Sequence, residues 1–196
     1  MAITFDIPLI RLGQGEPWSV LALRTGTTFL AALVIWAVWR WRSPNAPKLL
    51  PGWLVLLVAA LYGLGSVFFV IAVYNTSTAN LAFILSFNTM FSALLSWVFL
   101  KERPKVATLL AMAAMIVGVA IIVGGSIGHG TLLGDLLALC SALSIATAIT
   151  LSRSTSEDMG FASLIGVVLP FLVGLFMVSR TGYSVDAPWW LIFNGV

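Results

Sequence analysis

Apolar stretches alternate with short polar or charged segments along most of the chain. A helix rises about 1.5 Å per residue, so about 20 apolar residues cross a hydrocarbon core of about 30 Å. Six stretches reach or approach that length: residues 18–39, 52–73, 79–100, 106–123, 132–151 and 161–178. Residues 1–12 and 189–196 are also apolar but too short to cross. The pattern predicts an all-α integral membrane protein, a polytopic helix bundle with six complete spans and partial first and eighth helices.

The basic residues lie mainly in the short segments between these stretches. If the segment KERPK at 101–105 is cytoplasmic, seven of the ten Lys and Arg residues fall on that side: Arg40, Arg42, Lys48, Lys101, Arg103, Lys105 and Arg153. Only Arg11 and Arg180 fall opposite, and Arg24 lies within a span. This bias follows the positive-inside rule. It predicts a multi-pass protein of the inner or plasma membrane whose partial first helix runs outward.

Composition supports the membrane class and excludes several functions. Hydrophobic residues make up 60% of the chain and charged ones 9%, against about 45–50% and 25% in soluble domains. The net charge of +3 comes from the loops just described, so no nucleic-acid partner is expected. We find no metal-ligand spacing, phosphate-binding loop or cofactor fingerprint. His129 and Ser126 lack an orienting carboxylate, so neither a cofactor nor an enzymatic activity is predicted.

The stretch at 79–100 carries a polar face. Asn88, Ser92 and Ser96 recur at every fourth residue and therefore share one side of a helix. Hydrocarbon offers these groups no hydrogen-bond partner, so the face is expected to turn toward other helices or a wet cavity. Two interpretations stay open at this point. The face makes hydrogen bonds between helices, or it lines a solute pathway with Asn88 and Ser92 as binding residues.

Other spans hold weaker candidates for a binding site. Tyr62, Ser66 and Phe69 share one face of the 52–73 stretch, and aromatic groups with a few polar ones suit a small organic solute. Ser141 is a further candidate on the 132–151 stretch. A neighbouring face of that stretch has small residues at four-residue spacing, which predicts close helix packing: Gly134, Ala138, Ala142, Ala146 and Thr150.

Three charged side chains need an explanation within or near the spans. Arg24 is expected either to extend toward the membrane interface or to pair inside the bundle, with Asp6 as the nearest acidic candidate. Asp6 lies in the partial first helix, near its outer end, and is a candidate for proton or cation coupling. Asp135 stands at the start of its span and is expected at the interface.

A family resemblance rests on the segments around the KERPK block. The run FILSFNTMFSALLSWVFLKERP at 83–104, followed by VATLLAMAAMIVGVAIIVGG at 106–125, resembles the fourth and fifth helices of an EamA-type repeat of the drug/metabolite transporter superfamily. The segment around Arg24 is similar to the second helix of that repeat. Asn88 and Thr89 depart from the pattern, because many relatives have Ala-Pro or Ser-Pro there. The resemblance implies ten helices in two five-helix repeats with both ends cytoplasmic.

A short internal similarity agrees with that plan. The triplets LIR at 9–11 and LSR at 151–153 each close an apolar helix, 142 residues apart, on opposite sides of the membrane. Inverted-topology repeats are a common plan of transporters. We therefore expect a first repeat at 1–130 that lacks the start of its first helix, and a second at 131–196 that stops within the eighth. The sequence is interpreted as truncated at both ends, with a natural short form as the alternative.

These observations predict a secondary transporter of a small metabolite, such as an amino acid or a related organic compound. Proton coupling, the direction of transport and a homodimeric assembly stay open. The expected partners are a small-molecule substrate and the lipid bilayer. A non-transporting membrane subunit or an inactive remnant is the alternative, and an intramembrane enzyme is disfavoured because no nucleophile or metal cluster is visible.

Overall fold

The structure is a computed structural model, and it describes residues 10, 15–42, 52–101, 104–126, 132–154, 162–183 and 185. Every regular element within these ranges is an α-helix. In chain order they are α2 (Pro17–Arg42), α3 (Trp53–Asn75), α4 (Thr78–Ser86), α5 (Asn88–Leu100), α6 (Val106–Ser126), α7 (Leu132–Ser154) and α8 (Ala162–Thr181). The helices cover all six predicted spans, with one span divided between α4 and α5, and the all-α class is confirmed.

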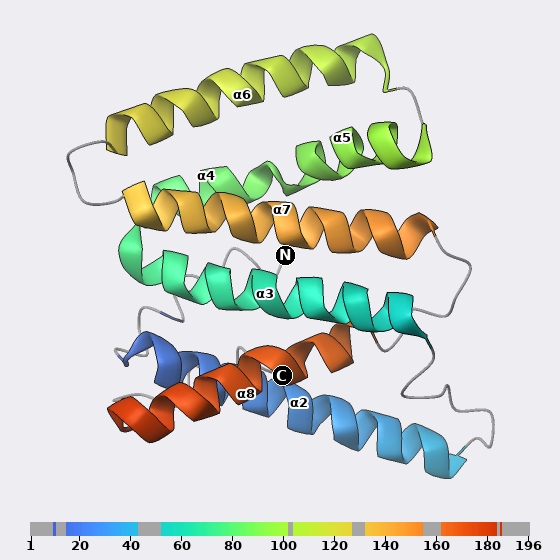
Figure 1. The fold of residues 1–196 in the computed structure, drawn as a ribbon, viewed down its shortest axis with the longest axis vertical. Coiled ribbons are helices and arrows are strands. Elements are labelled where there is room, and N and C mark those ends of the chain that lie inside the picture. Colours follow the sequence, from blue (N-terminus) through green and yellow to red (C-terminus); the bar gives the residue numbers. More distant parts are fainter. Residues whose placement is uncertain are drawn as a thin grey trace.

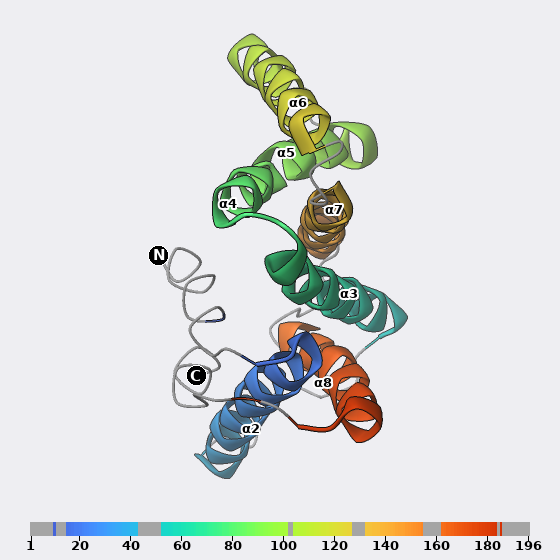
Figure 2. The same cartoon turned by 90° about the vertical axis from the view of Figure 1, so that its left-hand side faces the viewer.

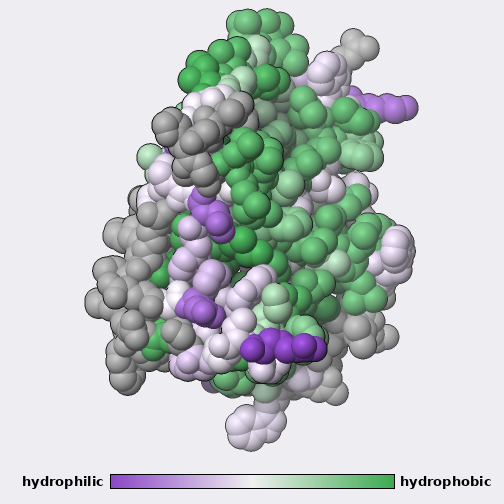
Figure 3. Space-filling view, turned by 60° about the vertical axis from the view of Figure 1, so that its left-hand side comes forward, coloured by the Kyte–Doolittle hydropathy of each residue, from purple (hydrophilic) through white to green (hydrophobic). Residues whose placement is uncertain are grey.

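The helices have the length and surface of membrane spans. Pro17–Trp39, Trp53–Asn75, Thr78–Leu100 and Leu132–Ser154 are long and apolar enough to cross a bilayer, and α6 and α8 contain shorter apolar stretches. Large apolar side chains face outward, among them Ile35 at 66% exposure and Ile121 at 69%. Hydrophobic side chains cover most of the right-hand part of the face in Figure 3. Such a surface suits lipid, and the protein is a polytopic helical membrane protein.

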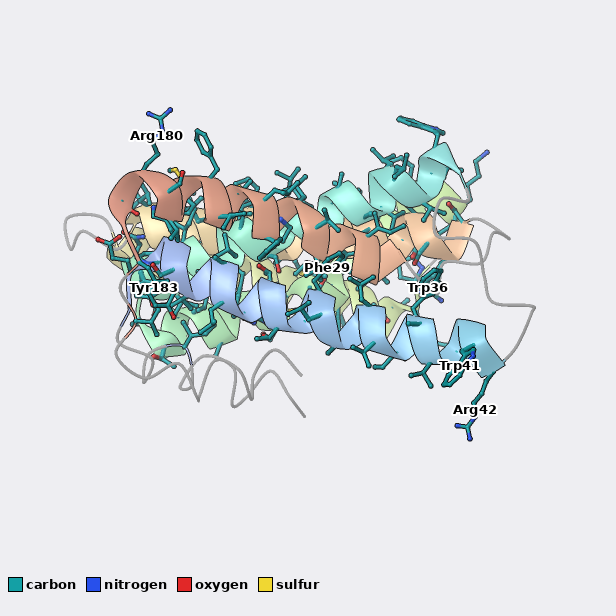
Figure 4. All side chains as sticks on the ribbon, turned by 90° about the horizontal axis from the view of Figure 1, so that it is seen from below. Phe29, Trp36, Trp41, Arg42, Arg180 and Tyr183 are labelled. Carbon is teal, nitrogen blue, oxygen red and sulfur yellow. The ribbon has the colours of Figure 1, made fainter. Side chains whose placement is uncertain are left out.

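Basic residues collect at one end of the bundle. Arg42, at the end of α2, and Arg180, near the end of α8, lie at opposite ends (Figure 4). Lys101 and Arg153 share the end of Arg42, because α5 and α7 run in the same direction as α2 (Figure 1). The predicted clustering of charge is therefore confirmed for the described residues. Of the partial first helix only Ile10 is described, and the predicted eighth helix at 189–196 lies outside the described residues.

The helices form a row with α3 and α7 at its centre. α7 lies between α3 on one side and α4 and α5 on the other (Figures 1 and 2). α6 occupies the edge beyond α4 and α5, while α2 and α8 pair at the opposite edge. The most extensive contacts join α3 to α7, α2 to α8, and α3 to α8. The largest core cluster draws residues from α2, α3, α4 and α7 and includes Ile10.

Small residues allow the close crossings in this row. The predicted run on α7 is buried at every position, which confirms its packing role: Gly134, Ala138, Ala142, Ala146 and Thr150. On the other side of α3, a Cβ atom on Gly63 would lie 2.8 Å from the carbonyl oxygen of Gly166 in α8. α8 also holds the buried Pro170 within its length. Backbone approaches of this kind are typical of helix packing in lipid, where no hydrophobic effect drives helices together.

Candidate functional site

The span at Thr78–Leu100 is broken near its middle. α4 ends at Ser86, Phe87 forms a turn, and α5 begins at Asn88. Phe87 is the tenth residue of the 23-residue span, about 14 Å from its start. Side-chain hydroxyls support the backbone at this point, because Ser86 donates to the Phe83 carbonyl (2.6 Å) and Thr89 donates to the Ser86 carbonyl (3.1 Å). Discontinuous helices of this kind, with polar groups at mid-membrane depth, are a feature of solute sites in transporters.

The side chain of Phe87 anchors the break. It is fully buried and forms a cluster with Met90 of α5 and Met112 of α6. Its ring meets that of Phe83 edge to face, with the centroids 5.0 Å apart. Because the turn residue is packed against α6, the positions of α4 and α5 on either side of it are fixed by the same cluster. Neither Gly nor Pro stands at the turn, which is why the sequence alone predicted an unbroken helix here.

The polar face of α5 turns into the protein, as the sequence predicted. The side-chain oxygens of Asn88 and Ser96 are buried and, within the described part of the chain, accept or donate no hydrogen bond. The hydroxyl of Thr150 on α7 donates to the Ala146 carbonyl (2.9 Å) and reaches the Ser92 carbonyl at 3.5 Å. α7 is therefore the helix that this face meets. A buried amide oxygen without a partner costs free energy, and at mid-membrane it is a natural acceptor for a ligand.

Tyr62 and Ser66 lie on α3, on the other side of α7 from Asn88 (Figure 2). Tyr62 is half-buried and packs against a cluster that contains Val58 and Ala148. Ser66 is also half-buried. The structure thus places the candidates in two groups, with Asn88 and Ser92 on α5 and Tyr62 and Ser66 on α3. Their role in solute binding stays a prediction.

Ser141 stands on the side of α7 that meets α3. It is fully buried, and its hydroxyl donates to the carbonyl oxygen of Gly65 at 2.8 Å. Gly65 itself permits the approach, because a Cβ there would lie 2.8 Å from the Ile145 side chain. Ser141 therefore links the two central helices, and contact with a solute would require its hydroxyl to leave this carbonyl.

Arg24 lies inside the bundle. Its guanidinium carbon sits 5.5 Å from the centre of the Phe69 ring on α3, and its Nη1 atom is buried. The hydroxyls of Thr27 and Thr28 both donate to the Arg24 carbonyl, at 2.8 and 2.9 Å. Of the two alternatives for this side chain, the structure favours a partner within the bundle over extension to the interface. Asp6, the acidic partner suggested by sequence, lies outside the described residues.

Asp135 lies in the first turn of α7, and its expected position at the membrane interface stays a prediction. Its side chain is fully buried where α7 meets the turn between α3 and α4. The hydroxyl of Thr76 donates to one carboxylate oxygen, and the amide of Asn80 lies 3.5 Å from the other. Both partners are more than fifty residues away in sequence, at separations of 59 and 55. Only the position of Asp135 in the first turn of α7 could have been read from the sequence, and that position alone does not indicate burial.

Comparison with known proteins decides the family. A sequence model of the EamA-like transporter family matches residues 1–124, which is more than half of the chain. The chain belongs to the EamA-like transporter family. A search of curated proteins and a search of solved structures each returned no match.

Membership accounts for the main features of the bundle. The EamA-like family belongs to the drug/metabolite transporter superfamily, so this EamA-like chain is a membrane transporter with several spans. The matched range includes α2 to α5 and all but the last two residues of α6, and with them the break at Phe87 and the polar face of α5. α7 and α8 follow the matched range, so Asp135 and Ser141 are interpreted from the structure alone.

Proposed function

We propose that this EamA-like protein is a secondary transporter of a small metabolite, such as an amino acid or a related organic compound, in the inner or plasma membrane. The solute binds near the middle of the membrane at the break between α4 and α5. Asn88 is its principal contact and Ser92 its neighbour. One observation carries this proposal: the amide oxygen of Asn88 is buried at mid-span, directly after a broken helix, with no hydrogen bond to any described residue.

The chemistry of this position indicates what kind of solute would bind. The Asn88 amide oxygen is an acceptor, so it suits an N–H or O–H donor on the solute. No Lys, Arg, Asp or Glu lies within α4 or α5, and the preceding residue, Phe87, packs in a cluster with Met90 and Met112. Flexible Met side chains with aromatic rings fit irregular organic groups. The site is therefore expected to accept a compact solute with a polar group and an apolar portion.

The candidates on α3 belong to the same transport cycle in this proposal. Tyr62 and Ser66 line the opposite side of α7 and contact the solute after the helices shift, while Ser141 exchanges its bond to Gly65 during that shift. Secondary transporters built from repeats move one group of helices against another around a site near the midplane. Arg24, held against Phe69, is a fixed positive charge along the route.

The test measures uptake of a mixture of tritium-labelled amino acids into liposomes that contain the purified protein. Wild-type protein is expected to take up label faster than empty liposomes. Asn88→Ala removes the acceptor, and the loss of one hydrogen bond to a buried partner, about 1–3 kcal/mol, should lower uptake about tenfold at low solute concentration. Thr89→Ala is the matched comparison: Thr89 is the next residue on α5 but is exposed, and its hydroxyl donates to the Ser86 carbonyl at the end of α4.

The outcomes test the role of Asn88 and the class of solute separately. Equal uptake by wild-type protein and Asn88→Ala would remove Asn88 from the site. A similar loss in Thr89→Ala would indicate damage to the break between α4 and α5 instead of a lost contact with the solute. Wild-type liposomes that take up no more label than empty ones would contradict amino acids as the solute class.

A further inference from the structure

Ser96 is a second buried polar position on the inner face of α5. Its side chain is 5% exposed, and its hydroxyl oxygen makes no hydrogen bond to any described residue. It stands eight residues after Asn88, about 12 Å along the helix and toward the end that carries Lys101. A buried hydroxyl without a partner costs free energy, so this position suits a group that the described chain does not supply.

A serine within a membrane helix ordinarily finds a partner in its own backbone. Its hydroxyl donates to the carbonyl three or four residues earlier, as Ser144 donates to the Cys140 carbonyl at 2.8 Å. For Ser96 the carbonyl four residues earlier belongs to Ser92. The hydroxyl of Thr150 on α7 reaches that same carbonyl at 3.5 Å. Ser96 therefore lies beside a backbone oxygen that already faces a hydroxyl of the neighbouring helix.

The contact between α5 and α7 at Ser92, Ser96 and Thr150 is referred to as the α5–α7 seam. The Thr150 hydroxyl is closer to the Ala146 carbonyl of its own helix, at 2.9 Å, than to the Ser92 carbonyl across the seam. A distance of 3.5 Å is at the outer limit of hydrogen bonding. On the other side of α7, the hydroxyl of Ser141 donates to α3 at 2.8 Å. The described hydrogen bonding across the seam is therefore the weaker of the two, and the seam separates at a smaller cost.

α5 is bounded by a break at one end and by a left-handed residue at the other. The turn at Phe87 precedes it, and Lys101, with φ at 57°, ends it. Hinge motions use residues at the ends of elements in this way. Phe87 is packed in a cluster with Met112 of α6, which makes it the fixed point. Rotation of α5 about this point moves Ser96 away from α7 by more than it moves Asn88, because Ser96 lies farther from Phe87.

The end of the seam beyond Ser96 is positively charged. Lys101 directly follows α5, Arg153 lies in the last turn of α7, and both are exposed. The two helices run in the same direction, so both charges lie at one end of the bundle, which we call the basic end (Figure 1). Positive charge of this kind attracts anionic groups. A solute that carries a carboxylate therefore meets favourable charge before it reaches Ser96.

We propose that Ser96 is a second solute contact, between Asn88 and the basic end, and that the α5–α7 seam is this half of the solute route. The inference rests on the proposed function and adds a binding position and the group it takes. The Ser96 hydroxyl donates to the solute carboxylate, whereas the Asn88 oxygen accepts from its ammonium group. Both groups of an α-amino acid are attached to one carbon atom, and the two positions are about 12 Å apart. The solute therefore contacts them one after the other, and it reaches Ser96 when α5 moves away from α7.

The first test measures how fast a membrane-impermeant maleimide labels single cysteines in liposomes, in a Cys140→Ala background. Ser96→Cys reports on the seam, and Val98→Cys reports on the outer face of the same helix, where Val98 is 63% exposed. Ser154→Cys, at the exposed end of α7, gives the rate of an accessible thiol at the basic end. We expect Ser96→Cys to react faster than Val98→Cys. Depth alone predicts the opposite order, because Val98 lies two residues nearer the basic end.

The second test adds the solute. Unlabelled amino acids above their half-saturating concentration should slow the labelling of Ser96→Cys at least about twofold by mass action, and they should leave Val98→Cys and Ser154→Cys unchanged. Ser96→Ala removes one hydrogen bond to the solute, so its uptake of the tritium-labelled mixture should fall about two- to tenfold. Ser179→Ala is the matched control, because the Ser179 hydroxyl is exposed and donates to its own helix on α8 at 2.6 Å. Its uptake should equal that of wild type.

Each outcome supports or overturns the second contact. Labelling of Ser96→Cys that is no faster than that of Val98→Cys, or that does not respond to the solute, overturns it. Uptake by Ser96→Ala at the wild-type level overturns it as well, and this measurement does not require the cysteine variant to fold. In each of these cases normal uptake by the wild-type protein leaves the site at Asn88 intact. Absence of uptake by the wild-type protein contradicts the proposed function itself, and the second contact with it.

Discussion

Gly63 of α3 and Gly166 of α8 lie directly against one another, and each would place a Cβ atom 2.8 Å from a backbone oxygen of the other helix. The oxygens belong to Gly166 and Ala59 and cannot rotate away as a side chain would. Gly63→Ala should therefore force α3 and α8 apart. Overpacking of this kind costs about 1–3 kcal/mol, so the midpoint of thermal unfolding in detergent should fall clearly below that of wild type.

Gly124→Ala is the control for that measurement. Gly124 lies in α6, and no atom of the described residues comes within 4 Å of the position its Cβ would take. Alanine favours a helix over glycine by about 1 kcal/mol, so this variant should be as stable as wild type or slightly more stable. Equal losses in both variants would mean that the α3–α8 contact does not set the effect of Gly63→Ala.

Ser141 should contribute to stability through its bond to Gly65. Hydrogen bonds between membrane helices contribute about 0.6 kcal/mol on average and up to about 1.7. Ser141→Ala is expected to lower the free energy of unfolding by an amount in that range. Ser144→Ala is the matched comparison, because the Ser144 hydroxyl donates to Cys140 of its own helix at 2.8 Å and joins no second helix. A loss in Ser144→Ala as large as that in Ser141→Ala would contradict the linking role.

Cys140 reports on the position of α7 in the bilayer. It is the only cysteine in the sequence, it is exposed on the protein surface, and it lies about 12 Å from the start of α7. In a bilayer the middle of a span is surrounded by hydrocarbon, which a membrane-impermeant reagent does not enter. A membrane-impermeant maleimide should label Cys140 at least about tenfold more slowly in liposomes than after denaturation. The control is Ser154→Cys in a Cys140→Ala background, because Ser154 is exposed at the end of α7. Its thiol should react quickly in both states.

The features that repeat along a single helix could be predicted from the sequence. The spans followed from the length of apolar stretches, and the four-residue spacing of small residues on α7 correctly indicated a packing face. The spacing of Asn88, Ser92 and Ser96 likewise predicted which side of that helix turns inward. Each of these signals depends only on the helical period and on the absence of hydrogen-bond partners in lipid.

Features that depend on the meeting of distant segments could not be predicted in this way. The burial of Asp135 follows from the close approach of Gly134 to Asn75, and the sequence gives no register between α3 and α7. The break at Phe87 has no Gly or Pro to mark it and depends on packing against Met112 of α6. The candidate binding residues on α3 and those on α5 lie on opposite sides of α7. The position of α7 between these two helices depends on how all the helices pack, which the pattern of a single helix does not show.

The contact between Arg24 and Phe69 should stabilise the packing of α2 on α3 more strongly than its exposed counterpart on α8. In that counterpart the Arg180 guanidinium carbon lies 5.2 Å from the centre of the Phe176 ring, and both residues are exposed. Cation–π contacts are worth about 0.5–1 kcal/mol when exposed and about 2 kcal/mol or more when desolvated. A double-mutant cycle with Arg24→Met and Phe69→Leu should therefore yield a coupling energy at least about twice that of Arg180→Met with Phe176→Leu, measured as the free energy of unfolding in mixed micelles. Equal coupling energies would mean that the Arg24 guanidinium stays hydrated in the folded protein, and its role as a buried charge along the solute route would then have to be abandoned.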